Sequence, residues 1–151
     1  MRKKSVFFLC TLLLVCVVSA AAARTVSCPG ARLTLTVPDD WQEVPLSGFE
    51  DPDLCLLLEG GDLSLSVYAS EAGSLLPDAF QVFTGDETES FSVTLSGVEM
   101  TCVAGKAPEG DYRVYTWLDR SRQVQFWFLV TGPELPALGV IDGIMSTLVF
   151  D

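Results

Sequence analysis

Alternating apolar and polar residues dominate the chain from residue 33 onward, and this period of two predicts β-strands. Residues 33–37 read LTLTV and residues 63–69 read LSLSVYA, with leucine and valine on one side and hydroxyl side chains on the other. A continuous apolar run begins at Leu54, and Gly60 and Gly61 end it. Because Gly60-Gly61-Asp62 is a turn signal, we expect a hairpin between this run and residues 63–69. Residues 91–103 alternate in the same way and are expected to hold one or two further strands.

The strongest strand pair is predicted in residues 111–119 and 123–132, which the polar segment 119–122 joins. The second of these strands has apolar residues on both sides, which is typical of a central strand that is covered on both faces. One side is formed by Val124, Phe126, Phe128 and Val130, and the other by Trp127 and Leu129. We therefore expect the first group to face the core.

Two segments have the signals of helices. Pro77 and the apolar residues up to Phe83 predict a short helix that Gly85 ends. The C-terminal segment has apolar residues at helical spacing from Leu138 to Leu148, and Pro133 and Pro136 suit its first turn. The predicted fold is a single α+β domain over residues 24–151, an antiparallel sheet flanked by helices.

The strand at residues 33–37 ends abruptly in the sequence VPDDW. Pro38 cannot donate a ladder hydrogen bond, and Asp39-Asp40 favour a turn, so the strand is expected to stop there. Trp41 can then fold back over the core beneath the terminal helix, because a tryptophan beside a turn more often packs than binds a ligand. The alternative is that the two acids and the indole form a site.

The first 23 residues have the layout of a secretory signal peptide. Basic residues at positions 2–4 precede an apolar run over 6–18 and a small-residue segment over 20–23, which predicts cleavage after Ala22 or Ala23. The run is short for a membrane span. We expect a secreted or cell-envelope protein with no membrane span after cleavage. Lipid anchoring at Cys28 is the less favoured alternative, because Thr25 replaces the leucine that usually precedes such a cysteine.

The net charge of the chain limits the classes of partner that it can bind. The sequence has twenty acidic and nine basic residues. Residues 24–151 contain all twenty acidic residues and only six basic ones, which gives a formal charge of −14. This charge repels nucleic acid and anionic lipid and favours cations or basic partners. The chain has no histidine, which excludes Ser-His-Asp and Cys-His catalysis and imidazole zinc sites. We expect a monomer without a cofactor.

Three cysteines remain after the signal peptide: Cys28, Cys55 and Cys102. An odd number in an exported chain allows one disulfide at most and leaves one thiol free, and the sequence does not choose among the three pairings. Cys55 and Cys102 lie inside predicted strands, where a free cysteine also packs as a small apolar side chain.

Three further groups of residues are candidates for binding. Calcium is a candidate ligand if two acidic loops meet at one end of the sheet, although the EF-hand spacing is absent. Three arginines near one hairpin could meet an acidic partner. Four aromatic residues on adjacent strands could form a platform, but a sheet face beneath a helix is the favoured explanation. These groups are Asp39, Asp40, Glu50, Asp51 and Asp53; Arg113, Arg120 and Arg122; and Tyr112, Tyr115, Trp117 and Trp127.

Three of the segments described above together resemble the PsbP-like family. They are LTVPDDWQEV at residues 35–44, the aromatic strand pair over 111–130, and IDGIMSTLVF at 141–150. The resemblance implies an α-β-α sandwich and a role in binding or assembly without catalysis, and it transfers no active-site residue to this chain. The expected function is an exported, non-enzymatic domain that binds a protein or surface component. A calcium-dependent accessory module and a hydrolase that uses carboxylates are the alternatives.

Overall fold

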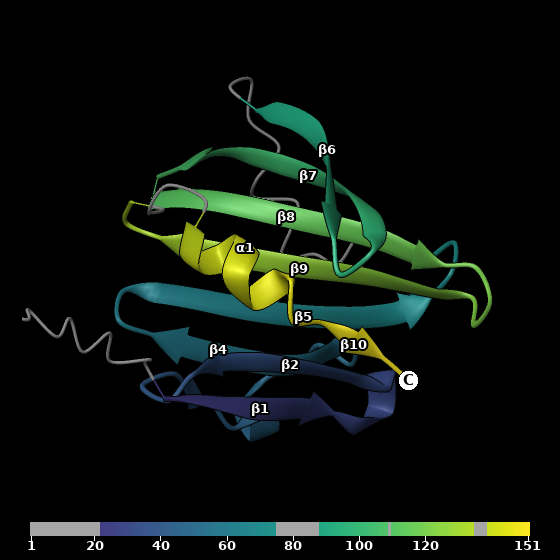
Figure 1. The fold of residues 1–151 in the computed structure, drawn as a ribbon, viewed down its shortest axis with the longest axis horizontal. Coiled ribbons are helices and arrows are strands. Elements are labelled where there is room, and N and C mark those ends of the chain that lie inside the picture. The colour runs from purple at the N-terminus through teal and green to yellow at the C-terminus, as the bar shows by residue number, and fades with distance from the viewer. Residues whose placement is uncertain (1–21, 75–87, 109, 135–138) are drawn as a thin grey trace, which may run out of the picture.

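A computed structural model of the protein describes residues 22–74, 88–108, 110–134 and 139–151, which form two antiparallel sheets (Figure 1). The large sheet has the strand order β3 (Gln42–Glu43), β4 (Leu54–Gly60), β5 (Leu63–Glu71), β9 (Val124–Gly132), β8 (Gly110–Asp119), β7 (Val98–Ala107) and β6 (Glu89–Leu95). The small sheet has the order β1 (Ala23–Cys28), β2 (Leu33–Pro38) and β10 (Val149–Phe150). Two short 3-10 helices, η1 (Pro29–Ala31) and η2 (Leu46–Gly48), follow β1 and β3.

The predicted strands and their central strand are confirmed. β4 and β5 form the expected hairpin, and Gly61 takes a left-handed φ of +60° in its turn, which glycine tolerates without a Cβ clash. β9 lies between β5 and β8, and both of its faces are covered. Phe126, Phe128 and Val130 are fully buried on one face, and Trp127 and Leu129 are buried on the other.

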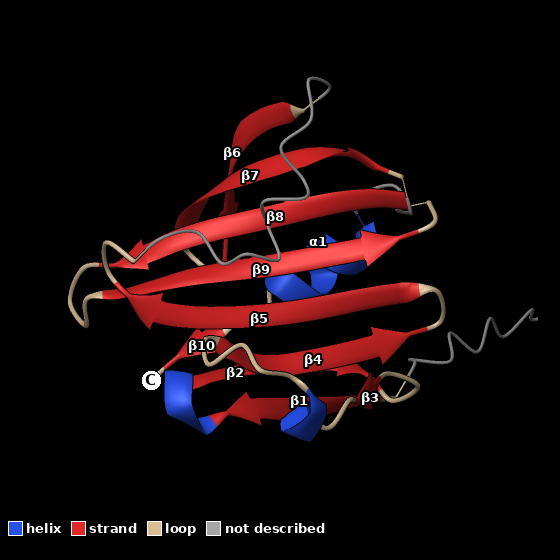
Figure 2. Ribbon diagram, turned by 180° about the vertical axis from the view of Figure 1, so that it is seen from behind, coloured by secondary structure: helices blue, strands red, loops and turns tan. Residues whose placement is uncertain are grey.

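The main core lies between the large sheet and a second layer, which consists of the small sheet and the helix α1 (Gly139–Met145). Figure 1 shows α1 in front of β8 and β9, and β10 and β2 in front of β5 and β4; the reverse view shows the same layer behind the large sheet (Figure 2). We call this covered side the inner face and the opposite side the outer face. A second, smaller cluster of buried residues that includes Tyr68, Tyr112, Trp127 and Leu129 belongs to the outer face.

The prediction of flanking helices is corrected in part. Within the described residues α1 is the single α-helix, and it begins at Gly139, so Pro133 precedes the helix instead of forming its first turn. The helix ends early because the chain turns to add β10 to the small sheet, where Phe150 pairs with Leu33. The helix predicted over residues 77–84 lies outside the described residues, as does Pro136.

Trp41 occupies a buried corner, as its position after the turn predicts. Its side chain is 4% exposed, and its backbone N–H donates to the Pro38 carbonyl oxygen at 3.0 Å. The indole lies directly on Gly60 at the end of β4, so closely that a Cβ there would overlap it. The corner therefore fixes the small sheet against the β4–β5 hairpin.

Candidate binding site

Five residues form a row across the outer face near one end of the large sheet. The strand register places Glu59 opposite Ser64, Ser64 opposite Thr131, and Thr131 opposite Tyr112, which in turn faces Gly105. Because paired residues in neighbouring strands point to the same side of a sheet, these side chains share one face. The row brings together residues from β4, β5, β9, β8 and β7.

Two glycines shape this end of the sheet. A Cβ on Gly105 would lie 2.7 Å from the Tyr112 hydroxyl oxygen, so the absent side chain leaves room for the ring. Gly110 has a φ of +143°, and a Cβ there would collide with the Gly132 carbonyl oxygen. The β7–β8 turn can therefore approach the end of β9 closely only with glycine at position 110.

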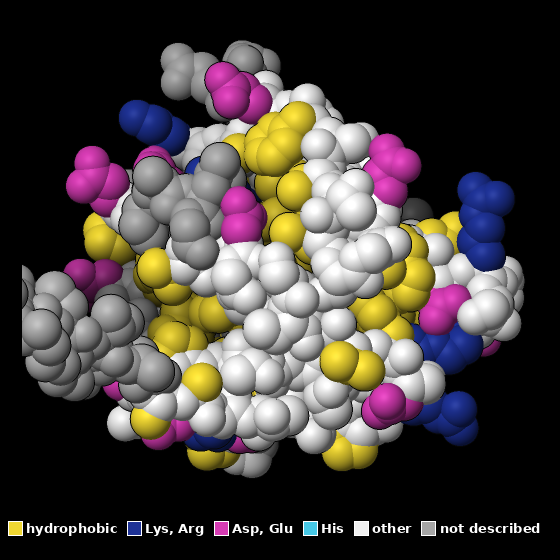
Figure 3. Space-filling view, viewed as in Figure 1, with side chains coloured by type: hydrophobic (Ala, Val, Ile, Leu, Met, Phe, Trp, Pro, Cys, Tyr) yellow, Lys and Arg dark blue, Asp and Glu magenta, His cyan; other side chains and the backbone are white. Residues whose placement is uncertain are grey.

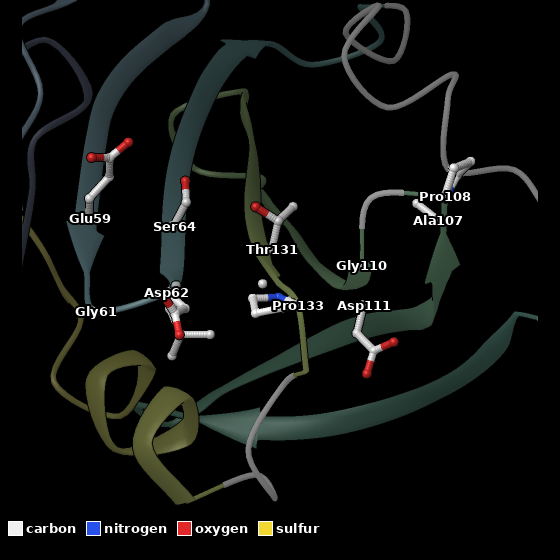
Figure 4. Close-up of a pocket in the computed structure, with 12 residues that line it drawn as sticks. Glu59, Gly61, Asp62, Ser64, Ala107, Pro108, Gly110, Asp111, Thr131 and Pro133 are labelled. Atoms are coloured by element: carbon white, nitrogen blue, oxygen red, sulfur yellow. The ribbon is translucent and has the colours of Figure 1, made fainter.

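A cavity of about 780 Å³ opens at this end of the sheet, between the β4–β5 turn and the β7–β8 turn (Figure 4). Figure 4 shows Glu59, Ser64 and Thr131 side by side on three strands, and Asp111 on the far side of Pro133. The polar side chains that line the cavity are Glu59, Asp62, Ser64, Asp111 and Thr131. We call this space the acidic cavity.

Among the described residues, the lining of the acidic cavity carries three carboxylates and no lysine or arginine. In the described part of the chain, the side chains of Glu59, Asp62 and Asp111 make no hydrogen bond or ion pair. A neighbouring cavity of about 250 Å³ shares Asp111 and adds Lys106 and Arg113. The acidic cavity therefore has negative charge available for a cationic group, with two basic residues at one margin.

The acidic loops that the sequence singles out do not meet. Asp39 and Asp40 follow β2 at the end of the molecule where Gln42 pairs with Glu59, whereas Asp51 and Asp53 precede Leu54 at the other end of β4. Five residues of extended strand separate these ends by about 17 Å. Within Asp51–Asp53, the Asp53 N–H donates to Asp51 Oδ1 at 3.0 Å, and Glu50 is exposed just before them. Burial, followed by the charge of Asp51, raises the pKa of Asp53.

No group of three or more acidic, cysteine or histidine side chains in the described ranges is arranged to hold a metal ion. The three cysteines are free thiols in the structure. Cys28 and Cys55 lie next to one another, since the Cys28 Sγ donates to the Cys55 carbonyl oxygen at 3.3 Å. Cys102 is buried separately in β7, where burial raises its pKa to about 11 although the Arg113 charge acts in the opposite direction.

The three predicted arginines have different surroundings. Arg122 donates from Nε to Asp119 Oδ2 at 2.6 Å and from Nη1 to the carbonyl oxygens of Ala31 and Asp151. Arg120 is exposed in the same turn. Arg113 lies in β8, where its Nη1 is buried without a hydrogen-bond partner. The arginines therefore do not form one patch, and Arg122 joins the β8–β9 turn to the small sheet.

Asp119 is the buried carboxylate that pairs with Arg122 in the β8–β9 turn. Its carboxylate also accepts hydrogen bonds from the Ser121 hydroxyl at 2.6 Å and from the backbone N–H groups of Ser121 and Arg122. These bonds, with those from Ser121 and Arg122 side chains foremost, lower the pKa of Asp119 to about 2. Arg122 additionally lies 5.6 Å from the centre of the Phe126 ring. The Asp119 carboxylate and the Arg122 guanidinium therefore stabilise the fold.

The four aromatic residues do not form one platform. Tyr115 and Trp117 belong to the inner face, where Trp117 stacks on Phe126 at 5.7 Å and the Tyr115 hydroxyl donates to Asp142 of α1 at 3.2 Å. Tyr112 and Trp127 belong to the outer cluster. Residues that alternate along one strand point to opposite faces, which explains the separation.

The sequence alone does not predict that the residues of the acidic cavity lie together. Glu59 and Asp62 bracket a predicted hairpin, so their proximity could have been inferred from the turn alone. Thr131 joins them through the register of β5 and β9, and Asp111 through the register of β8 and β9, which no spacing in the sequence specifies. A row of small polar residues at strand ends was the available signal, and it is too common to be diagnostic.

The sheet order and the covering layer define a protein class by its fold. In a comparison with solved structures, the chain is similar to the solution structure of cyanobacterial PsbP (CyanoP) from Synechocystis sp. PCC 6803, with a TM-score of 0.60 and 16% sequence identity over 89% of this chain and 96% of that one. A crystal structure from Bacteroides thetaiotaomicron VPI-5482 is similar over 85% of this chain and 48% of that one, with a TM-score of 0.52 and 15% identity.

The chain therefore has the PsbP-like fold, as the sequence resemblance predicts. No family model matches the sequence, and no curated protein matches it either. In the part of the chain that the structure describes, there is no helix with the length and apolar character needed to cross a membrane.

Proposed function

We propose that this chain is an exported, non-enzymatic binding module whose acidic cavity takes a basic segment of a protein or surface partner. The observation that carries the proposal is a cavity of about 780 Å³ with three carboxylates that have no cation among the residues lining it. Carboxylates without partners at the rim of a cavity attract lysine and arginine side chains, and they do so over a distance limited by salt screening. The overall acidity of the chain acts in the same direction.

The surroundings of the cavity favour binding over catalysis. In the described part of the chain, neither the Ser64 nor the Thr131 hydroxyl is hydrogen-bonded to a carboxylate that could activate it. The chain also has no histidine to act as a base near neutral pH. The carboxylate hydrolase and the calcium-dependent module stay predictions, and calorimetric injection of calcium chloride tests the latter.

Export with cleavage near Ala23 is supported by the pairing of β1. Arg24 to Cys28 pair with Val37 to Leu33 of β2, so cleavage after Ala22 or Ala23 leaves these five pairs in place. Lipid anchoring would require cleavage immediately before Cys28, which would remove residues 24–27 from the ladder. Mass spectrometry of the exported protein is expected to show a chain that starts near Arg24. An intact Met1, or a diacylglycerol-modified Cys28, would contradict the proposal.

Calorimetric titration with a short lysine- and arginine-rich peptide tests the binding role. The Asp62→Asn/Asp111→Asn double variant is expected to bind at least ten-fold more weakly, and binding by the natural chain should weaken as salt is added. The matched control is Glu71→Gln/Glu99→Gln, which removes the same charge from exposed positions at the opposite end of the sheet. Equal losses in both variants would show diffuse charge attraction and would reject the site.

A further inference from the structure

Two cysteines from different sheets meet in the core. Cys28 is the last residue of β1 in the small sheet, and Cys55 lies in β4 of the large sheet. The Cys28 Sγ donates to the Cys55 carbonyl oxygen at 3.3 Å, and the Cys55 Sγ donates to the Val67 carbonyl oxygen at the same distance. The two thiols also lie within hydrogen-bonding reach of one another. A disulfide needs the two residues to be close neighbours, and these contacts place Cys28 directly beside Cys55.

The geometry points to a disulfide between Cys28 and Cys55, which joins the small sheet to the large sheet, with Cys102 left as the free thiol. The strand order excludes one alternative directly. Three strands separate β4 from β7, so Cys55 and Cys102 lie four strand spacings, or about 19 Å, apart. Because Cys28 contacts Cys55, it is distant from Cys102 as well.

The local environment of Cys28 favours its reaction. The hydrogen bond from the Cys55 thiol, supported by the Ala31 backbone and opposed by burial, lowers the pKa of Cys28 to about 7. The same hydrogen bond and burial raise the pKa of Cys55. Since the thiolate is the reactive form, Cys28 is the first nucleophile of the pair.

The bond forms by exchange with a disulfide donor, such as oxidised glutathione or a thiol–disulfide oxidoreductase. The Cys28 thiolate attacks one donor sulfur and releases the first donor thiolate; Cys55 then loses its proton, attacks the Cys28 sulfur and releases the second. Two protein thiols lose two electrons and two protons, and the donor disulfide becomes two thiols. Cys28 is 2% exposed, so the donor reaches its sulfur when the end of β1 opens locally from the large sheet.

The bond would close a loop between residues 27 positions apart, which contains β2, the Trp41 corner and both acidic loops. Such a loop restricts the unfolded chain and strengthens the contact between the two layers. Formation of the bond in the cell rests on the proposed export, because thiols in reducing compartments stay reduced. Formation in a redox buffer does not depend on export or on the binding role.

Peptide mapping of the natural chain after incubation in a glutathione redox buffer tests the pairing. Free thiols are blocked by alkylation in denaturant, and the unreduced chain is cut after arginine, lysine and glutamate. Cys28, Cys55 and Cys102 then lie in separate peptides, over residues 25–32, 51–59 and 100–106. We expect the first two peptides to be cross-linked and the third to be alkylated. A link to Cys102, or three alkylated cysteines under oxidising conditions, would overturn the proposal.

Thermal unfolding gives an independent readout. The oxidised chain is expected to melt about 10 °C above the reduced chain. Cys28→Ser and Cys55→Ser should each abolish this difference, whereas Cys102→Ala, the matched control, should keep it even if both of its forms melt lower. A redox-dependent difference that survives Cys55→Ser, or one that Cys102→Ala removes, would contradict the assigned pair.

Discussion

The two ends of the large sheet both carry acidic residues, but they use them differently. At the β8–β9 turn, Asp119 is buried and accepts bonds from Ser121 and Arg122, and Arg122 continues to carbonyl oxygens of Ala31 and Asp151. At the opposite end, Glu59, Asp62 and Asp111 surround the acidic cavity without a cation among its lining residues. Charge at the first end holds the layers together, and charge at the second end is available to a ligand.

This difference shows that the number of acidic residues is a poor guide to a binding site. A carboxylate that already accepts several hydrogen bonds within the protein would have to break them to bind a partner, and this would lower the stability of the fold. A carboxylate at a cavity rim contributes little to stability and can change without unfolding the protein. The comparison therefore predicts opposite consequences for substitutions at the two ends.

The largest loss of stability is expected when a large side chain is removed from the core of the sheet. Phe128 is fully buried on the inner face of the central strand, so Phe128→Ala should lower the free energy of unfolding by about 3–5 kcal/mol. Chemical denaturation measures this loss. Phe91→Ala, at a position that is 39% exposed on β6, is the control and should cost far less. Equal losses would contradict the assignment of β9 as the buried centre of the sheet.

The next effect separates the two ends directly. Asp119→Ala should cost about 2–3 kcal/mol, because the variant loses charged hydrogen bonds and leaves Arg122 with fewer partners. Asp62→Ala, at the exposed cavity rim, should cost about 0.5 kcal/mol or less. If the two substitutions have similar effects on denaturant unfolding, the proposed division between structural and available charge is invalid.

The pH dependence of stability sharpens the same contrast. The folded chain holds the pKa of Asp119 at about 2, below the ordinary value of an aspartate, so the unfolded chain binds more protons between about pH 4 and pH 2. The contribution of Asp119 is present above pH 4 and is lost as the pH falls through this window. The free energy of unfolding of Asp119→Asn should consequently fall less steeply over that range than that of the natural chain.

A smaller effect is expected where the Trp41 indole packs on Gly60, next to the cavity rim. Gly60→Ala introduces a Cβ into the space of the Trp41 indole and should cost about 1–3 kcal/mol. Gly48→Ala is the matched control, because nothing lies near the Cβ that it would add. A stability left unchanged by Gly60→Ala would show that the indole does not pack there.

The sequence was most informative about single strands and least informative about their arrangement. The alternation in residues 33–37 and 63–69, and the two apolar faces of residues 124–130, identify strands because the period of two follows from the pleat itself. The corner at Trp41 follows from Pro38 and the turn after it. The terminal helix is predicted too long because its apolar spacing continues to Leu148, which lies between α1 and β10.

The sites depend on information that a local pattern does not contain. The acidic cavity arises because the register aligns the ends of β4, β5, β9 and β8, and Glu59 and Asp111 are far apart in the sequence. The proximity of Cys28 and Cys55 arises from the stacking of one sheet on another. Both are consequences of tertiary packing, so the sequence could name the residue types but not the groups that they form.

The binding role of the acidic cavity is tested most directly by nuclear magnetic resonance of the labelled protein during titration with the lysine- and arginine-rich peptide. We expect the backbone amide signals of Gly61, Asp62, Ser64, Asp111 and Thr131 to shift in a saturable manner, while those of Asp119, Ser121 and Arg122 stay in place. Shifts centred on the β8–β9 turn, or no saturable shift at the acidic cavity, would contradict the claim that the peptide binds at the acidic cavity.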